Sequence, residues 1–289
     1  MDELLNELSI CFDKDTVDKI VSGYVNKYVT IRINNLKASD EEVFSYLDNN
    51  NITYEKVSFY DKALVLKNVT NEEIINSELF KEGKIYLQSL SSMLPPLFMD
   101  LKDDSNILDM TASPGSKLSE IQALSNNKTL ITGVERNKER FERLKYNVDH
   151  LGCKKVTLLN MDARDLNDFM KFDEILLDVP CSGSGTVTNK DDVKNFGSIL
   201  EHSIKTQKVL IDKALKLLKP NGTLIYSTCS LLDKEDEDII RSVLGDEYKL
   251  EPIRIDGILN YESKLEGTIK VLPNEYFEGF YIAKIKKVK

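Results

Sequence analysis

Residues 106–117 read NILDMTASPGSK, and this stretch decides the fold class of the chain. A short apolar run ends at the acidic Asp109, a loop with Pro114 and Gly115 follows, and a helix is predicted to begin near Ser116. A turn of small residues between a strand and a helix lets a ligand approach the backbone closely. The loop matches neither GxGxxG nor GxxxxGK[ST], so the fingerprints of dinucleotide and nucleoside-triphosphate sites are absent.

Strands and helices alternate from this stretch onward. Apolar runs predict strands at 106–110, 129–135, 155–160, 172–178, 222–228 and 280–286. Between them, helices are predicted from about 116, over 138–150, over about 199–218 and from about 231. This alternation predicts an α/β fold with a parallel sheet and helices on both of its faces. Ligands of such sheets bind beyond the carboxyl ends of the strands.

Each of the first four predicted strands ends at or just before an acidic residue. These residues are Asp109, Glu135, Asp162 and Asp178. A carboxylate at such a position can accept hydrogen bonds from ribose hydroxyls. A single one is better explained as a helix cap or a solvated charge. Four in succession favour a cationic ligand that contains ribose, and S-adenosylmethionine is one.

The four cysteines, Cys11, Cys153, Cys181 and Cys229, contain no CxxC pair, and the chain has only two histidines. A disulfide scaffold and a zinc site are therefore excluded, and no metal is expected. Cys11 and Cys153 are best interpreted as small buried hydrophobes.

Cys181 and Cys229 differ, because each follows a predicted strand in a loop rich in small residues. The two loops would meet at one sheet edge. Cys229 is expected just before a helix, whose N-terminus lowers a thiol pKa. A thiolate suits attack on an electron-poor ring.

The acidity of the chain limits its partners. The 289 residues carry a net charge of −9, with −7 in residues 1–100 and −2 in residues 101–289. This balance argues against a protein that holds nucleic acid by bulk charge. No stretch approaches the ~20 apolar residues of a membrane span. The N-terminal MDELLNELSI lacks the basic region of a signal peptide, so a cytoplasmic location is expected. The chain is also expected to be a monomer.

The residues before the pair Pro95–Pro96 predict a smaller α/β unit. Helices are expected at about 2–12, 15–24, 39–49 and 86–99, and strands at 28–34, 54–58 and 63–66. The helix at 39–49 opens with the capping box Ser39-Asp-Glu-Glu.

Five segments resemble, in order, those of the Nol/Nop/Sun RNA cytosine-5 methyltransferases, the RsmB/NOP family. They are LDMTASPGSK (108–117), GVERNKER (133–140), MDAR (161–164), DVPCSGSG (178–185) and YSTCSLLDKEDE (226–237). The similarity covers roughly residues 28–287. The resemblance implies a class I, Rossmann-like methyltransferase with a seven-stranded, mostly parallel sheet. It places a small RNA-recognition-like α/β domain at 1–84 and the catalytic domain at 85–289.

The resemblance also implies the roles of individual residues. Cys229 would be the nucleophile that adds to C6 of a cytosine, and Cys181 would assist its release as acid or base. Asp178 and Lys117 would bind the edge of the cytosine. The residues expected around S-adenosylmethionine are Thr111, Ala112, Ser113, Pro114, Gly115, Ser116, Lys117, Glu135, Arg140, Asp162 and Asp178. The substrate would be rRNA in the first place and tRNA in the second.

Four departures from the family pattern stand out. Ser116 replaces the usual second Gly, although some members also have Ser there. Leu118 replaces the usual Thr, Asp236 replaces the usual Asn between two Glu residues, and the usual Arg after PCSGSG is missing. Two alternatives stay open. A DNA cytosine methyltransferase would carry PCQ and ENV, whereas this chain has PCS and EDE. A non-catalytic RNA-binding protein on the same fold would not need both cysteines.

The residues considered for RNA contact are basic and aromatic. Phosphate contacts are considered for Arg32, Lys37, Lys190, Lys194, Lys284, Lys286, Lys287 and Lys289, and base stacking for Tyr24, Tyr28 and Tyr60. Taken singly, each is better explained as a solvated charge or a half-buried core residue. The chain is therefore expected to bind bare, non-specific RNA weakly.

Overall fold

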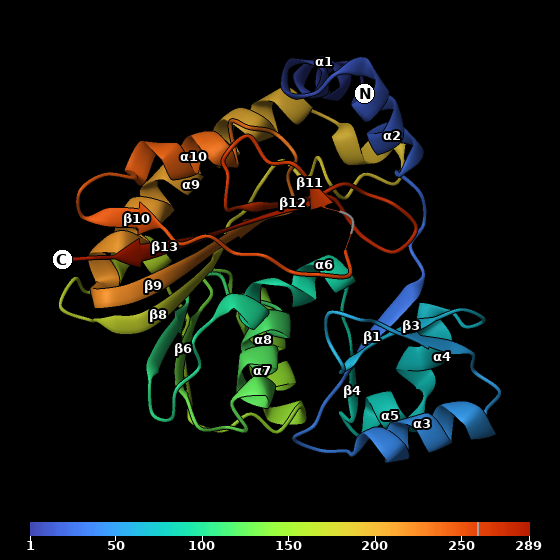
Figure 1. The fold of residues 1–289 in the computed structure, drawn as a ribbon. Coiled ribbons are helices and arrows are strands. Elements are labelled where there is room, and N and C mark those ends of the chain that lie inside the picture. The colour runs from blue at the N-terminus through green and yellow to red at the C-terminus, as the bar shows by residue number, and fades with distance from the viewer. Residues whose placement is uncertain (259) are drawn as a thin grey trace. The chain divides into compact units, whose positions relative to one another are not determined.

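The computed structural model describes residues 1–258 and 260–289, and their side chains except those of Lys190, Asp191 and Asn260 (Figure 1). The chain divides into two compact units. We call the first the SPG unit, because it contains the loop with Ser113, Pro114 and Gly115; it comprises Tyr28–Leu166 and Ile255–Gly257. We call the second the thiol-pair unit, because it contains Cys181 and Cys229; it comprises Met1–Lys27, Asn167–Arg254 and Ile258–Lys289.

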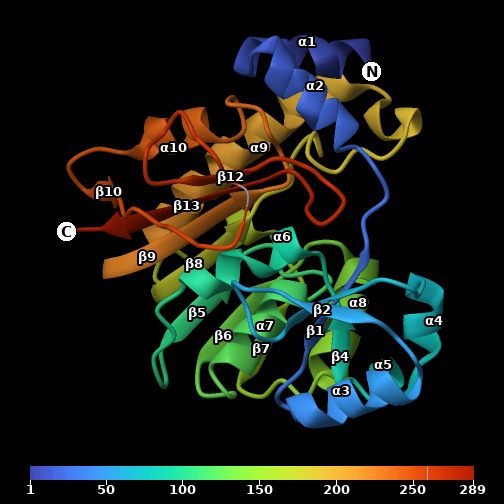
Figure 2. The ribbon, with the colours of Figure 1, turned by 45° about the vertical axis from the view of Figure 1, so that its right-hand side comes forward.

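The SPG unit begins with a four-stranded antiparallel sheet in the order β2-β3-β1-β4 (Figure 2). Its elements are β1 (Val29–Ile33), α3 (Asp40–Asn49), β2 (Tyr54–Lys56), β3 (Ala63–Leu66), α4 (Asn71–Asn76), α5 (Glu78–Lys81) and β4 (Ile85–Leu87). Alternate residues of β1, among them Ile31 and Ile33, pack with Leu47 of α3 and Leu64 of β3 in a buried cluster. Ser39 caps α3 by accepting a hydrogen bond from the backbone N–H of Glu42, as its capping motif predicts.

The remainder of the SPG unit holds three parallel strands. Its elements are α6 (Leu90–Met93), a 3₁₀ turn (Pro95–Phe98), β5 (Asn106–Asp109), α7 (Ser116–Leu124), β6 (Leu130–Val134), α8 (Lys138–His150), β7 (Val156–Leu159) and a second 3₁₀ turn (Ala163–Asp165). Asp109 is level with Gly133 in the β5–β6 register, and Gly133 is level with Leu158 in the β6–β7 register. The carboxyl ends of the three strands therefore share one edge.

The thiol-pair unit holds parallel strands β8 and β9, onto which β13 adds in antiparallel fashion. Its strand order is β11-β12-β13-β9-β8, and β10 also pairs with β13. Its elements are α1 (Asp2–Cys11), α2 (Lys14–Ser22), β8 (Phe172–Asp178), a 3₁₀ turn (Lys190–Val193), α9 (Phe196–Leu217), β9 (Leu218–Thr228), α10 (Glu237–Val243), β10 (Tyr248–Leu250), β11 (Asn260–Tyr261), β12 (Ile269–Val271) and β13 (Phe280–Lys287). Leu4, Leu8 and Ile20 of the first two helices pack in one cluster with Phe196 and Leu200 of α9.

The α/β class and the predicted strand–helix alternation are confirmed. The helix predicted over 86–99 is wrong, because β4 occupies its start, Ser89 caps the short α6, and Pro95 begins a 3₁₀ turn. The helix predicted from about 231 begins only at Glu237. Outside the four-stranded antiparallel sheet, the described residues form nine strands in place of the expected seven, three in the SPG unit and six in the thiol-pair unit. The division at residue 84 stays a prediction. Within the described ranges, no helix is both long and apolar enough to cross a membrane.

Candidate active site

The loop between β5 and α7 is built from short-range contacts that keep its backbone close to the strand ends. The N–H of Thr111 donates to Asp109 Oδ1 at 3.3 Å, and the N–H of Ala112 donates to the carbonyl of Val134 at 3.0 Å. Gly115 precedes α7 with φ of +103°, and a Cβ built there would lie 3.1 Å from Leu144 Cδ1. A residue without a side chain is therefore required at the point where the loop turns into the helix.

Helix α8 holds the other side of this loop. Ser113 Oγ donates to the carbonyl of Arg140 at 2.9 Å, and Arg140 Nη2 donates back to the carbonyl of Ser113 at 3.1 Å. Asn147 Nδ2 donates to the carbonyl of Pro114 at 2.8 Å. Arg140, predicted as a cofactor residue, thus supports the loop backbone in this structure. Its contact with a cofactor stays a prediction.

Two predicted carboxylates lie beyond the ends of β6 and β7. Glu135 is 6% exposed; its Oε1 accepts from the N–H of Asn137 at 2.7 Å, and its Oε2 lies 3.3 Å from Arg140 Nε. Asp162 accepts from Arg164 Nε at 2.9 Å and from Arg164 Nη2 at 2.6 Å. Hydrogen bonding to Arg164 lowers the pKa of Asp162 to about 2, so this carboxyl is ionised at neutral pH.

Lys117 lies in the first turn of α7 and is buried. Its Nζ donates to Ser92 Oγ at 2.9 Å. Nearby, Gln88 Nε2 donates to Glu120 Oε2 at 2.7 Å. Burial raises the pKa of Glu120 to about 8, against the opposing effects of Arg32, Gln88 and Lys117. A polar buried network therefore surrounds the helix that follows the loop.

The thiol-pair unit brings Cys181 and Cys229 together, as the sequence predicts. Their Sγ atoms lie 2.8 Å apart. The loops are joined on both sides of the sulfurs, because Val179 N–H donates to the carbonyl of Ser227 at 3.0 Å and Gly185 N–H donates to the carbonyl of Cys229 at 2.9 Å. Two loops from the ends of β8 and β9 thus form one structural element.

The thiol of Cys181 has a raised pKa. The hydrogen bond with Cys229, together with burial, raises the pKa of Cys181 well above that of an ordinary thiol. Cys181 therefore keeps its proton at neutral pH. Burial also raises the pKa of Cys11 and of Cys153 to about 11, consistent with inert thiols. The expected helix N-terminus beside Cys229 is wrong, because α10 begins only at Glu237.

Asp178 is the last residue of β8, next to the thiol pair in sequence. Its Oδ1 accepts from Ser227 Oγ at 2.6 Å. The contact links the last residue of β8 to the next-to-last residue of β9. Its predicted role on a cytosine edge stays a prediction.

Glu235 is the residue of this site that sequence reasoning missed. Its carboxylate accepts hydrogen bonds from the hydroxyls of Ser182 and Ser230, which directly follow the two cysteines. The signal was present as a Cys-Ser dipeptide in both loops and an acidic triplet downstream. Asp236, noted only as a departure from the family, accepts from Thr228 Oγ1 at 2.6 Å and lies 3.3 Å from the buried Lys270. Burial raises the pKa of Asp236 well above its usual range.

Several residues considered for RNA contact are not surface groups. Arg32 is fully buried; its Nε donates to Gln88 Oε1 at 2.9 Å and its Nη2 to Ser119 Oγ at 2.8 Å. Lys284 is buried and pairs with Glu251 at 2.9 Å, and Tyr60 is buried. For these three residues an RNA contact is wrong, because their side chains are buried.

The remaining RNA candidates have mixed surroundings. Tyr24 is half-buried and donates from its hydroxyl to the carbonyl of Ser184 at 2.6 Å. Lys286 and Lys287 lie 3.9 Å from Glu251 and 3.2 Å from Glu247. Lys37, Lys194, Lys289 and Tyr28 are exposed. The side chain of Lys190 lies outside the described residues. RNA contact by these side chains stays a prediction.

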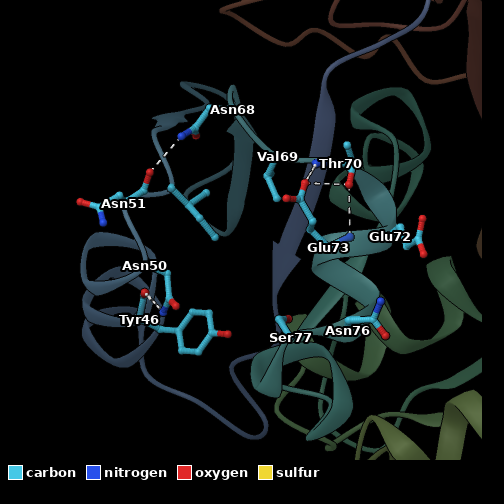
Figure 3. Close-up of a pocket in the computed structure, with 11 residues that line it drawn as sticks. Tyr46, Asn50, Asn51, Asn68, Val69, Thr70, Glu72, Glu73, Asn76 and Ser77 are labelled. Carbon is cyan, nitrogen blue, oxygen red and sulfur yellow. Dashed lines mark hydrogen bonds between the residues drawn. The ribbon is translucent and has the colours of Figure 1, made fainter.

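A separate hollow lies on the four-stranded part of the SPG unit (Figure 3). Tyr46, Asn50 and Asn68 line one part of it, and Glu72 and Glu73 lie on the opposite part. None of its lining residues is a lysine or an arginine, and none belongs to the predicted site. Its acidic side chains make it a poor surface for phosphate.

Comparison with known proteins identifies the family. The profile of 16S rRNA methyltransferase RsmB/F matches residues 96–286. Ribosomal RNA small subunit methyltransferase F of Vibrio parahaemolyticus is 34% identical over 275 residues, which cover 89% of this chain and 56% of the relative. The chain thus spans little more than half the length of the curated relatives it matches.

Solved structures agree with the fold over the whole length. A methyltransferase homologue from Pyrococcus horikoshii superposes with a TM-score of 0.80 at 27% identity, covering 99% of both chains. NSun6 from Pyrococcus horikoshii superposes with a TM-score of 0.88 at 22% identity, covering 100% of this chain and 98% of that one. The latter likeness concerns the fold alone. Because the family profile covers about two thirds of its residues, the chain belongs to the RsmB/F family of 16S rRNA methyltransferases.

Proposed function

We propose that this protein transfers a methyl group from S-adenosylmethionine to C5 of a cytosine in RNA, with Cys229 as the nucleophile. One observation carries the proposal: two thiols from adjacent loops lie 2.8 Å apart in a member of an rRNA methyltransferase family. The reaction needs such a group, because C5 of an unactivated cytosine is too poor a nucleophile to accept a methyl group directly. Addition of a thiolate to C6 makes C5 electron-rich.

The SPG unit has the features that S-adenosylmethionine requires. Asp109, Glu135 and Asp162 follow three neighbouring parallel strands at one edge, where ribose hydroxyls and a positive charge find acceptors. Gly115 has a φ of +103°, which lets the loop turn into α7 directly beyond the end of β5. When bound, the cofactor supplies an electrophilic methyl group on a sulfonium. The residues of 111–117, Glu135, Arg140 and Asp162 would hold it.

The two cysteines would divide the remaining chemistry. The Sγ of Cys229, as thiolate, would form a bond to C6 of the cytosine, and Asp178 on the cytosine edge would favour protonation at N3. After C5 has been methylated, a base removes the C5 proton, and the bond from C6 to Cys229 breaks with its electron pair returning to sulfur. Cys181 retains its proton because of its raised pKa; it would donate that proton to the leaving Cys229 sulfur and take one back from the base that removed the C5 proton.

The proposed substrate is rRNA of the small ribosomal subunit, with tRNA as the second choice. The relative from Vibrio parahaemolyticus is named a ribosomal RNA small subunit methyltransferase. The net charge of −9 favours recognition through shape or through a ribonucleoprotein surface over recognition by bulk charge. The target cytosine must leave its stack to reach a thiolate, so it lies in a single strand or is flipped out. Residues 1–84 would act as a domain of RNA recognition and residues 85–289 as the catalytic domain.

Two experiments test the proposal. Bisulfite sequencing of total RNA, with and without the gene, should reveal a cytosine in small-subunit rRNA that loses its methyl mark when the gene is deleted. Titration of the purified protein with S-adenosylmethionine should raise its melting temperature. A bisulfite profile that is identical in both strains would reject the activity. A melting temperature that does not respond to the cofactor would favour a non-catalytic RNA-binding protein on this fold.

A further inference from the structure

One carboxylate lies between the two cysteine loops. Glu235 Oε2 accepts from Ser182 Oγ at 2.5 Å and from Ser230 Oγ at 2.6 Å. Glu235 Oε1 accepts from the backbone N–H of Ser182 at 2.8 Å. These serines directly follow Cys181 and Cys229, so the same carboxylate holds the residue next to each sulfur.

Glu235 is itself fixed on all sides. It is fully buried, and Gln207 Nε2 of α9 donates to its Oε1 at 3.1 Å. Its own carbonyl accepts from Tyr226 Oη at 2.6 Å, which attaches its backbone to β9. Four donors therefore point at one buried carboxylate. Because these donors come from both cysteine loops and from α9, the arrangement restricts both loops.

Other contacts between the loops do not involve the Glu235 carboxylate. Gly185 N–H donates to the carbonyl of Cys229, and Ser184 Oγ lies 3.0 Å from Ser230 Oγ. Both contacts are made by residues that follow Cys181 in the chain, and neither involves Ser182. Loss of the Glu235 carboxylate should therefore leave the loops paired while it releases the backbone of Ser182 and the adjacent Cys181.

We propose that Glu235 is a positioning residue for methyl transfer, which sets the separation and orientation of the Cys181 and Cys229 sulfurs through Ser182 and Ser230. This inference rests on the proposed function. It assigns Glu235 no contact with RNA or with the cofactor. Its action is to keep the proton of Cys181 beside the sulfur that leaves C6.

Glu235→Gln is the direct test. The amide keeps the size of the side chain. Its N–H₂ group, however, faces donors that bind a carboxylate oxygen in the unsubstituted protein. A displaced reactive group costs on the order of 10²-fold in rate. We expect kcat for methyl transfer to fall by about 10²-fold, while KM for RNA and the Kd for S-adenosylmethionine stay unchanged.

Glu237→Gln is the matched control. Glu237 is equally buried two residues further on, but its carboxylate accepts from Lys270 Nζ at 2.8 Å and from Ser263 Oγ at 2.8 Å. This variant removes a buried charge from the same segment without touching either cysteine loop. Ser182→Ala is the second variant, because it removes one partner of Glu235 and keeps the carboxylate buried.

The readout that separates geometry from activity is the rate at which dibromobimane bridges Cys181 and Cys229 in the folded protein. We expect bridging to slow severalfold in Glu235→Gln and in Ser182→Ala and to stay unchanged in Glu237→Gln. The effects of Glu235→Gln and Ser182→Ala should not add in the double variant, since both break the same contact.

The outcomes of the two readouts are distinguishable. Unchanged bridging in Glu235→Gln, or an equal loss of kcat in folded Glu237→Gln, would overturn the role of Glu235. Slowed bridging in Glu235→Gln, in a protein whose unsubstituted form methylates no RNA, would support the positioning of the sulfurs and reject the proposed function instead.

Discussion

The Sγ atoms of Cys181 and Cys229 lie 2.8 Å apart, although 48 residues separate the two cysteines in the chain. Parallel pairing produces this proximity. Asp178 of β8 is level with Ser227 of β9, so the two loops leave the sheet at the same height. Each cysteine follows within three residues of its strand end, which leaves the sulfurs little freedom to separate.

We expect Cys229→Ala to abolish methyl transfer while binding of S-adenosylmethionine persists. Alanine removes the sulfur that adds to C6, and the predicted cofactor residues other than Asp178 lie in a different unit. Incorporation of a labelled methyl group into RNA and calorimetric titration with the cofactor measure the two properties. Cys153→Ala is the control, because burial keeps that thiol protonated. Activity of Cys229→Ala close to that of the unsubstituted protein would contradict the assignment of the nucleophile.

Cys181→Ala should accumulate a covalent adduct between the protein and RNA. The Cys229 sulfur can still add to C6, but the thiol that exchanges a proton during release is missing. The adduct would survive a denaturing gel as a band of reduced mobility that nuclease treatment removes. The double variant with Cys229→Ala should show no such band. If Cys181→Ala turns over without any adduct on a confirmed RNA substrate, Cys181 has no role in release.

The sequence predicted the parts of the site that depend on strand ends. Asp109, Glu135 and Asp178 each end a strand or follow it directly, and the cysteine loops meet where parallel topology requires. These predictions succeeded because the edge position of a residue follows from chain order alone. Contacts between side chains that are far apart in the sequence were not predicted. Glu235 lies 53 residues from Ser182, and no spacing rule links a downstream acid to a serine in another loop.

Surface predictions failed for a related reason. Arg32 was considered a phosphate contact because phosphate binding normally needs lysine or arginine. It is buried, and Gln88 and Ser119 accept hydrogen bonds from its guanidinium group. Arginine side chains are rarely fully buried, so the residue type alone predicts an exposed position for Arg32. The prediction of a helix over 86–99 was wrong because the apolar residues there have helical spacing. In the structure, Ser89 caps the short helix α6 and Pro95 begins a separate 3₁₀ turn.

Gly185→Ala should destabilise the cysteine loops. A Cβ at Gly185 would lie 2.1 Å from the carbonyl oxygen of Gly279, inside any permitted contact. The backbone of Gly185 also donates to Cys229 and accepts from Gly279, so the strain reaches the thiol pair directly. Overpacking of this kind costs about 1–3 kcal/mol. Chemical denaturation should show this loss in the free energy of unfolding, with a parallel loss of activity.

Gly245→Ala is the control for that substitution. In the part of the chain that the structure describes, no atom lies within 4 Å of a Cβ built at Gly245. Its stability should stay within about 0.5 kcal/mol of the unsubstituted protein. A loss in Gly245→Ala as large as that in Gly185→Ala would show that the close approach to Gly279 is not the cause.

Glu120→Gln should change how stability depends on pH. Burial raises the pKa of Glu120 from 4.5 to about 8 in the folded protein, so the folded state binds one more proton than the unfolded state between these values. The free energy of unfolding therefore falls as pH rises from about 5 to 8, by at most about 1.4 kcal/mol per pH unit from this group. Below the unfolded pKa the contribution is fully present, and above the folded pKa no more is lost. Glutamine stays neutral and still accepts from Gln88.

The prediction is read as a difference between two pH profiles. The melting temperature of Glu120→Gln, relative to that of the unsubstituted protein, should rise steadily from pH 5 to pH 8 and level off beyond it. The positive charges of Arg32 and Lys117 lower the pKa of the same carboxyl group. The rise in melting temperature therefore stays below the rise that burial alone would cause. Glu72→Gln, at an exposed carboxylate of α4, is the control for removal of one acidic group. If the difference between Glu120→Gln and the unsubstituted protein is constant over this range, Glu120 is ionised in the folded protein, and its neutral state at pH 7 is rejected.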